Sequence, residues 1–176
     1  MRTNENKYDY IIGIDPDSDK SGVALLNVQT RTFEFVRALT FVDCIKFLDS
    51  LAARELQVLI VIEDSDVSTA FRSLYGKKLA VVFAMGRSVG KCHACFEHLL
   101  QYAESVGLTT YRQPPLQKIW GAHRDSKISQ QELKYQNVSG IPTRTNPEMR
   151  DACLLALYRS PIPIVKHERL LRTVKK

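Results

Sequence analysis

The chain has 176 residues, 44% of them hydrophobic and 25% charged, with a formal net charge of +6. This composition can form one ordinary hydrophobic core, so we expect a single domain over residues 1–176. No apolar run approaches the roughly 20 residues of a membrane span, and the first ten residues lack the apolar centre of a secretory signal. We therefore expect a cytoplasmic protein without a membrane partner, with its four cysteines reduced.

The positive charge is unevenly distributed. A short basic tail occupies about residues 161–176, and no acid occurs between Asp66 and Glu97. That acid-free segment contains five basic residues, namely Arg72, Lys77, Lys78, Arg87 and Lys91. Such a segment can hold the phosphates of a nucleic acid. On charge alone, a solvated basic surface is an equally good interpretation.

The first half of the chain predicts four strands and a helix. A β-branched run over residues 8–15 ends at Asp15, and Gly13 would let another segment approach the backbone closely. A polar turn follows, and then we expect strands over 23–28 and 32–39 and a helix over 43–54. The continuous apolar run 56–62 predicts a central strand covered on both faces, and it ends at Glu63.

The second half predicts mainly helices. We expect a loop and a short helix over 67–85, a long helix over 86–105 closed by Gly107, and a short strand over 108–112. A polar helix over 126–135 follows. Asn146-Pro147-Glu148 is typical of a helix start, and that helix should run to about residue 159. The order predicts an α/β fold with a mixed five-stranded sheet flanked by helices.

Four acids stand out by their positions. Asp15 and Glu63 each end a buried strand, while Glu148 and Asp151 are three residues apart and share one helix face. Singly, such acids are more often helix caps or exposed polar residues. Close carboxylates repel one another unless a cation neutralises them, and oxygen-only ligands favour Mg²⁺ or Mn²⁺ over zinc. With the basic segment, the pattern indicates a metal-dependent phosphodiesterase that acts on nucleic acid.

Five segments resemble, in the same order, the RuvC-type Holliday junction resolvases, which have the RNase H-like fold. They cover nearly the whole chain up to about residue 160. The matching segments are IIGIDPDSDKSGVALL, LIVIED, GRSVGKCHACFEHL, PPLQKIWGAHRDSKISQ and IPTRTNPEMRDACLLAL.

The resemblance implies a homodimeric, Mg²⁺-dependent endonuclease that nicks two opposed strands of a four-way DNA junction. By position, its metal-binding catalytic acids would be Asp15, Glu63, Glu148 and Asp151. Proteins that drive branch migration are candidate partners.

The resemblance also implies DNA-binding residues. Lys127 would contact a phosphate near the scissile bond, and Arg124 lies in the same stretch. Arg87 and Lys91 would open the helix whose N-terminal end faces the DNA in relatives.

The chain departs from the family at three places. The family usually has aspartate at the position of Glu148 and glycine at that of Asp17. Relatives also carry a junction-opening aromatic just after the strand-four glutamate, where this chain has residues 64–66, Asp-Ser-Asp. Phe71 and Tyr75 are the candidates for that role.

Several alternatives compete with this interpretation. Cys92-His93-Ala94-Cys95 is half of a zinc site without its other half, so buried thiols are the better interpretation. An actin-like ATPase would need a second lobe. Two alternatives stay open: a nuclease of the same fold that acts on a hybrid, flap or RNA precursor, and a catalytically silent junction-binding protein.

Overall fold

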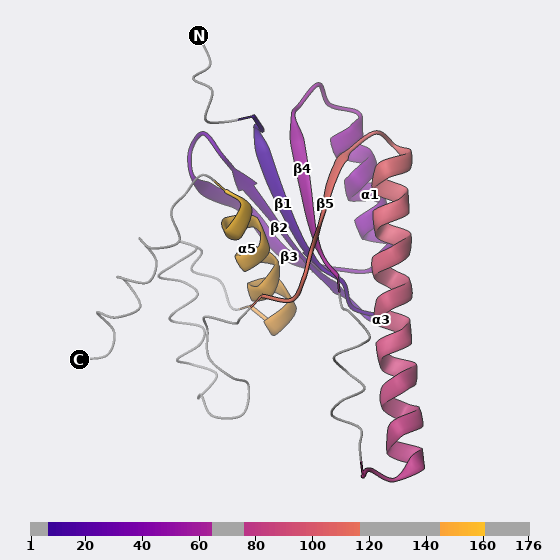
Figure 1. The fold of residues 1–176 in the computed structure, drawn as a ribbon. Coiled ribbons are helices and arrows are strands. Elements are labelled where there is room, and N and C mark those ends of the chain that lie inside the picture. Colours follow the sequence, from indigo (N-terminus) through magenta and orange to yellow (C-terminus); the bar gives the residue numbers. More distant parts are fainter. Residues whose placement is uncertain (1–6, 65–75, 117–144, 161–176) are drawn as a thin grey trace, which may run out of the picture.

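The protein forms a five-stranded sheet with helices on its two faces (Figure 1), as seen in a computed structural model that describes residues 7–64, 76–116 and 145–160. The strands are β1 (Tyr10–Asp15), β2 (Ser21–Asn27), β3 (Thr32–Leu39), β4 (Val58–Glu63) and β5 (Thr109–Gln113). The helices are α1 (Phe41–Ala52), α3 (Leu79–Ser105) and α5 (Pro147–Arg159). The predicted fold class is therefore confirmed, and the predicted helix over 126–135 lies outside the described residues.

The strand order is β3-β2-β1-β4-β5. Strands β1, β2 and β3 form an antiparallel meander, whereas β4 pairs in parallel with both β1 and β5. Parallel neighbours need crossover connections, and α1 and α3 occupy the two crossovers in the chain. The predicted arrangement, three antiparallel strands followed by two reached through crossovers, is confirmed.

Side chains that alternate along the strands divide the core into two layers. On one face, Ile11 and Leu59 pack in a cluster with the apolar residues of α5. On the other, Ile12 and Ile60 pack with residues of α1 and α3. Strand β4 is buried from Val58 to Ile62, as expected for a strand covered on both sides. Within the described ranges, no helix is long and apolar enough to cross a bilayer.

Helix α3 begins earlier than the sequence predicts. It starts at Leu79 after Lys78, not at Gly86, and runs without a break to Ser105. The prediction was wrong because Gly86 was taken as a boundary, whereas an interior glycine only costs a helix about 1 kcal/mol. The end of the helix is as predicted, since Gly107 adopts the left-handed conformation with φ of 80°.

The starts of α1 and α5 depend on side-chain caps. The Thr40 hydroxyl accepts a hydrogen bond from the amide of Asp43, so α1 begins two residues before the predicted position. In α5, the Asn146 side chain accepts from the amide of Met149 at 2.8 Å, and Pro147 is the first helical residue. The predicted start of α5 is confirmed.

Candidate active site

Asp15 and Glu63 lie at the ends of two neighbouring parallel strands. Asp15 is the last residue of β1 and Glu63 the last of β4, and the residues before them, Ile14 and Ile62, pair in register. The two acids therefore end their strands at the same level, on strands about 5 Å apart. Alternation along the strands puts both on the face that α5 covers.

Two glycines let α5 lie directly on the main chain of the sheet. A Cβ on Gly13 would stand 1.9 Å from the carbonyl oxygen of Ala152, and one on Gly22 would stand 2.0 Å from that of Glu148. At these distances, a side chain at either position would force the two main chains apart. Gly22 pairs with Asp15 across β1 and β2, so the main chain of Glu148 lies against the strand partner of Asp15. The close approach predicted at Gly13 is confirmed.

The first turns of α5 are firmly held. Arg150 is 4% exposed, and its Nη1 donates to the carbonyl oxygen of Thr145 at 2.9 Å and to its hydroxyl at 3.2 Å. Asp151 is 5% exposed, whereas Glu148 is partly exposed. The alternative of Asp151 as an exposed polar residue is therefore wrong. A buried carboxylate costs free energy unless a partner compensates its charge.

The four acids all carry carboxylates, but their side chains do not form a complete set of metal ligands. In the described ranges, no three or more Asp, Glu, His or Cys side chains are grouped so that they could hold a metal ion. Helix α5 lies on the main chain of β1 and β2 near Asp15, but no three of these four acids group closely enough to hold a metal ion. Their carboxylate oxygens suit Mg²⁺ or Mn²⁺ and do not suit zinc.

Comparison with known proteins identifies the fold. No family model and no curated protein match the chain. Thermus thermophilus RuvC in complex with a Holliday junction substrate matches 94% of this chain and 96% of its own, with a TM-score of 0.52 at 14% identity. The chain shares its fold with RuvC. A second Thermus thermophilus RuvC structure matches the same shares, with a TM-score of 0.50 at 16% identity.

A third match is the large terminase nuclease from thermophilic phage G20c, with a TM-score of 0.36 at 16% identity over 87% of this chain and 83% of that one. The two RuvC matches agree with the predicted fold class, a mixed five-stranded sheet flanked by helices. At these identities the likeness concerns the fold, and the roles of individual residues stay predictions.

Asp17 organises the turn that follows β1 in this RuvC-like fold. Its Oδ1 accepts from the amide of Asp19 at 2.8 Å, and its own amide donates to the Ser21 hydroxyl at 3.3 Å. Its Oδ2 lies 3.8 Å from the Cys92 thiol of α3. Where the RuvC family usually has glycine, the carboxylate of this chain thus closes the turn and links it to α3.

The predicted DNA-binding residues that are described lie on the N-terminal half of α3 and directly before it. Lys77, Lys78, Arg87 and Lys91 are all exposed. This half of the helix extends past the ends of the strands (Figure 1). Arg87 and Lys91 do not open the helix as predicted, because it begins at Leu79, about two turns earlier. They are four residues apart and therefore share one helix face.

Five other predicted residues lie outside the described residues. They are the DNA-binding candidates Arg72, Arg124 and Lys127 and the junction-opening candidates Phe71 and Tyr75.

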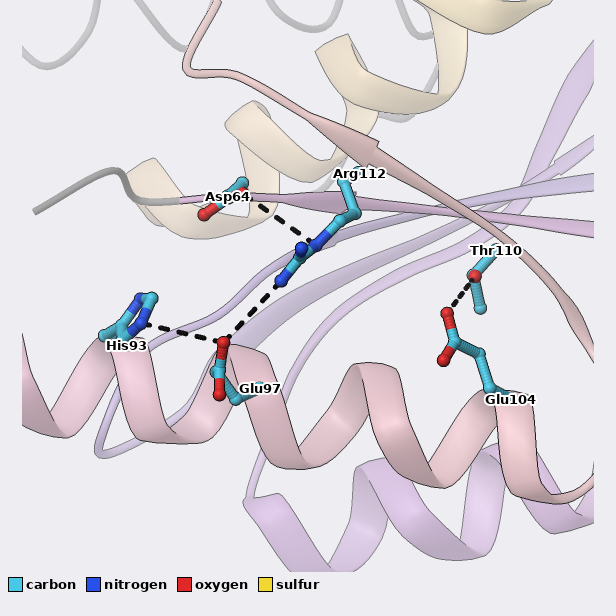
Figure 2. Close-up of polar contacts among 6 residues, drawn as sticks. All are labelled: Asp64, His93, Glu97, Glu104, Thr110 and Arg112. Carbon is cyan, nitrogen blue, oxygen red and sulfur yellow. Dashed lines mark hydrogen bonds and ion pairs between the residues drawn. The ribbon is translucent and has the colours of Figure 1, made fainter.

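An ion-pair network that the sequence did not predict links β4, β5 and α3. Figure 2 shows Arg112 of β5 between Asp64 and Glu97, with N–O distances of 3.9 and 3.6 Å. The His93 Nε2 lies 3.7 Å from Glu97 Oε1. Asp64 directly follows Glu63, so the network connects α3 to the chain just beyond a candidate metal ligand. Only the topology reveals these contacts, since no spacing in the sequence relates Arg112 to Asp64.

None of the four cysteines, all of which the structure describes, forms a disulfide. Cys95 is buried as predicted, but Cys92 is partly exposed, which corrects its assignment as a buried thiol. Cys44 and Cys153 are buried as well. Burial raises the pKa of the Cys95 thiol, and burial also raises that of Cys92. His93 contacts Glu97, and no zinc cluster forms among the described residues.

Proposed function

We propose that the chain is a homodimeric, Mg²⁺-dependent endonuclease that resolves four-way DNA junctions by paired symmetric nicks. The observation that supports this proposal is the seating of α5 on Gly13 and Gly22, which puts the main chain of Glu148 against the strand partner of Asp15. The fold supports it, because RuvC with this fold has been solved with a Holliday junction substrate.

Each candidate residue has a defined part in this proposal. Asp15, Glu63, Glu148 and Asp151 would hold the divalent cation, their side chains rotating to meet it and their mutual repulsion falling as it binds. Bound metal would activate a water and stabilise the leaving oxygen of the phosphodiester, and Mn²⁺ would substitute for Mg²⁺. Lys127 would stabilise charge on the phosphate. The exposed basic residues of α3 would hold the DNA arms through their phosphates.

The decisive experiment compares cleavage of a four-way junction and of a matched linear duplex in the presence of Mg²⁺. We expect the junction alone to be cut. Asp15→Asn should reduce the cleavage rate by roughly 100-fold or more, a size in keeping with the loss of charge stabilisation at a reacting centre. Asp19→Asn is the matched control, since Asp19 is an exposed acid of the neighbouring turn. Its rate should equal that of the parent.

The other outcomes separate the alternatives. Equal cleavage of both DNAs would contradict junction specificity and favour another nuclease of this fold. Junction binding without cutting would favour the silent binder. Cleavage that survives Asp15→Asn would remove the metal-site assignment.

Two paired nicks require two active sites, and a symmetric dimer supplies them. We expect sedimentation to give a dimer at the concentrations at which paired nicking occurs. A monomer that still makes paired nicks would contradict this part of the proposal. Branch-migration proteins should change the rate at which junctions are presented and leave the positions of the nicks unchanged.

A further inference from the structure

Two exposed tyrosines and an arginine form a stacked group at the outer strand of the sheet. The Arg159 guanidinium carbon lies 3.5 Å from the ring centroid of Tyr111 and 5.5 Å from that of Tyr158. Tyr111 is 39% exposed and Tyr158 is 47% exposed. We call these three residues the edge stack. Both tyrosines are therefore accessible to solvent beside a cation, and one face of the Tyr111 ring is covered by the guanidinium.

The guanidinium is held in place by Gln113. Arg159 Nη2 donates to Gln113 Oε1 at 3.2 Å, and Gln113 is 5% exposed. Arg159 Nε is buried without a hydrogen-bond acceptor. Within residues 7–64, 76–116 and 145–160, no carboxylate lies within ion-pair distance of Arg159. The edge stack thus carries a positive charge that no described acid neutralises, and a phosphate suits it.

The edge stack borders the candidate active site. Gln113 pairs with Glu63 in the parallel register of β4 and β5, and Tyr111 pairs with Val61. Because side chains alternate, Tyr111 and Gln113 face the same side of the sheet as Glu63. Strand β5 is the last in the strand order, so a ligand at the edge stack would lie beside the acid-bearing strand ends.

We propose that the edge stack binds an unpaired stretch of DNA next to the scissile phosphate. A base would stack on an exposed tyrosine ring, and Arg159 would pair with the adjoining phosphate. Aromatic rings accept any base, because every base has a π-face, and arginine adds cation–π and phosphate contacts. This inference rests on the proposed function for its position near a cleavage site. It goes further by assigning unpaired DNA to a defined surface.

The test measures binding of a fluorescein-labelled 16-nucleotide thymidine strand by anisotropy, in an Asp15→Asn background that should not cut DNA. We expect Tyr158→Leu to weaken binding roughly tenfold, within the range found for loss of one base–aromatic stack. The same strand with abasic sites in place of its bases should show no such loss. Phe41→Leu is the matched control, since Phe41 of α1 is 41% exposed and lies beside Ile45 and Tyr102 on the α1 and α3 side of the sheet.

A second readout tests the charge. Arg159→Gln should lower the slope of log affinity against log salt by about 0.7, the value for one phosphate contact with a single strand. Tyr158→Leu should leave that slope unchanged. A merely structural role would alter the melting temperature and leave both the abasic dependence and the salt slope as they are in the parent.

Failure of the inference and failure of the proposed function are distinguishable. Unchanged affinity in Tyr158→Leu, or an equal loss on the abasic strand, would overturn the inference whether or not the parent cuts junctions. Absence of junction cleavage by the parent would overturn the proposed function while the anisotropy result stands on its own. Weaker binding in Phe41→Leu equal to that in Tyr158→Leu would also contradict the edge stack as a specific site.

Discussion

Helices α5 and α3 cover opposite faces of the sheet in different ways. Helix α5 has an unbroken buried run from Arg150 to Leu157 and touches the main chain of the sheet at Gly13 and Gly22. Helix α3 is twice as long, but its buried residues all lie in its second half, between Cys95 and Ala103. A helix seated on backbone fixes its side chains closely, whereas the free half of α3 is available for contacts. Two of the four candidate metal ligands, Glu148 and Asp151, lie on α5, and the candidate phosphate contacts Arg87 and Lys91 lie on α3.

The largest effect on the free energy of unfolding should come from substitutions in the buried half of α3. Phe96 is fully buried, and Phe96→Ala should lower the free energy of unfolding by about 3–5 kcal/mol. Phe83, on the free half of the same helix, is 71% exposed, so Phe83→Ala should change stability by less than about 0.5 kcal/mol. Urea denaturation measures both. Equal losses would show that the free half of α3 packs against something that stabilises the fold.

Substitution where α5 contacts the main chain of the sheet should lower the free energy of unfolding almost as much. Gly13→Ala forces a methyl group against the Ala152 carbonyl, where neither main chain can move aside, and should cost about 3 kcal/mol. Gly86→Ala is the matched control in α3, because a Cβ there meets nothing within 4 Å. It should raise stability by about 0.5–1 kcal/mol, since alanine is the better helix former. A neutral Gly13→Ala would contradict the close contact between α5 and β1.

The sequence could predict the parts of the site that depend on local patterns. The β-branched runs before Asp15 and Glu63 predict strands, and the Asn146 cap predicts the start of α5, because each signal is complete within a few residues. Gly13 predicted a close approach of another segment, but the sequence could not show which segment, because Ala152 lies about 140 residues away in the chain.

The rest depends on long-range packing. The Arg112 network and the edge stack each join β5 to a helix, and no periodicity relates those elements. The start of α3 was predicted at Gly86 and not at Leu79, because a glycine in a sequence usually indicates the end of a helix or a loop. Asp64 was noticed only as a departure from a family pattern, whereas the fold gives it a partner in Arg112.

The core on the α1 and α3 side also predicts a pH dependence. Burial raises the pKa of the Cys44 thiol from an ordinary 9.0 to about 12. Above pH 9 the unfolded chain loses this proton while the folded chain keeps it, so stability is fully present below pH 9 and falls as pH rises towards 12. The slope should be about 1.4 kcal/mol per pH unit from this thiol.

Urea denaturation at pH 8 and pH 10 measures this slope. Cys44→Ala should be less stable at both pH values because of the cavity it leaves, but its stability should decline less between them. An equal decline in the parent and in Cys44→Ala would show that other groups, such as Tyr10 and Tyr102, whose pKa values are raised by hydrogen bonds to carboxylates, account for the alkaline loss.

The smallest effect on stability should come from removing the ion pairs that join α3 to β5. Arg112 is 53% exposed and its partner Glu97 is 43% exposed, so water and salt screen their attraction. A double-mutant cycle of Arg112→Gln and Glu97→Gln should give a coupling energy of about 0.2–1 kcal/mol at low salt, and less at 1 M salt. Ion pairs of this strength do not fix a helix, which agrees with α3 being held by Phe96 and its apolar neighbours. A coupling energy of several kcal/mol that persists in high salt would contradict the contrast between the two helices, because polar contacts would then help to fix the second half of α3.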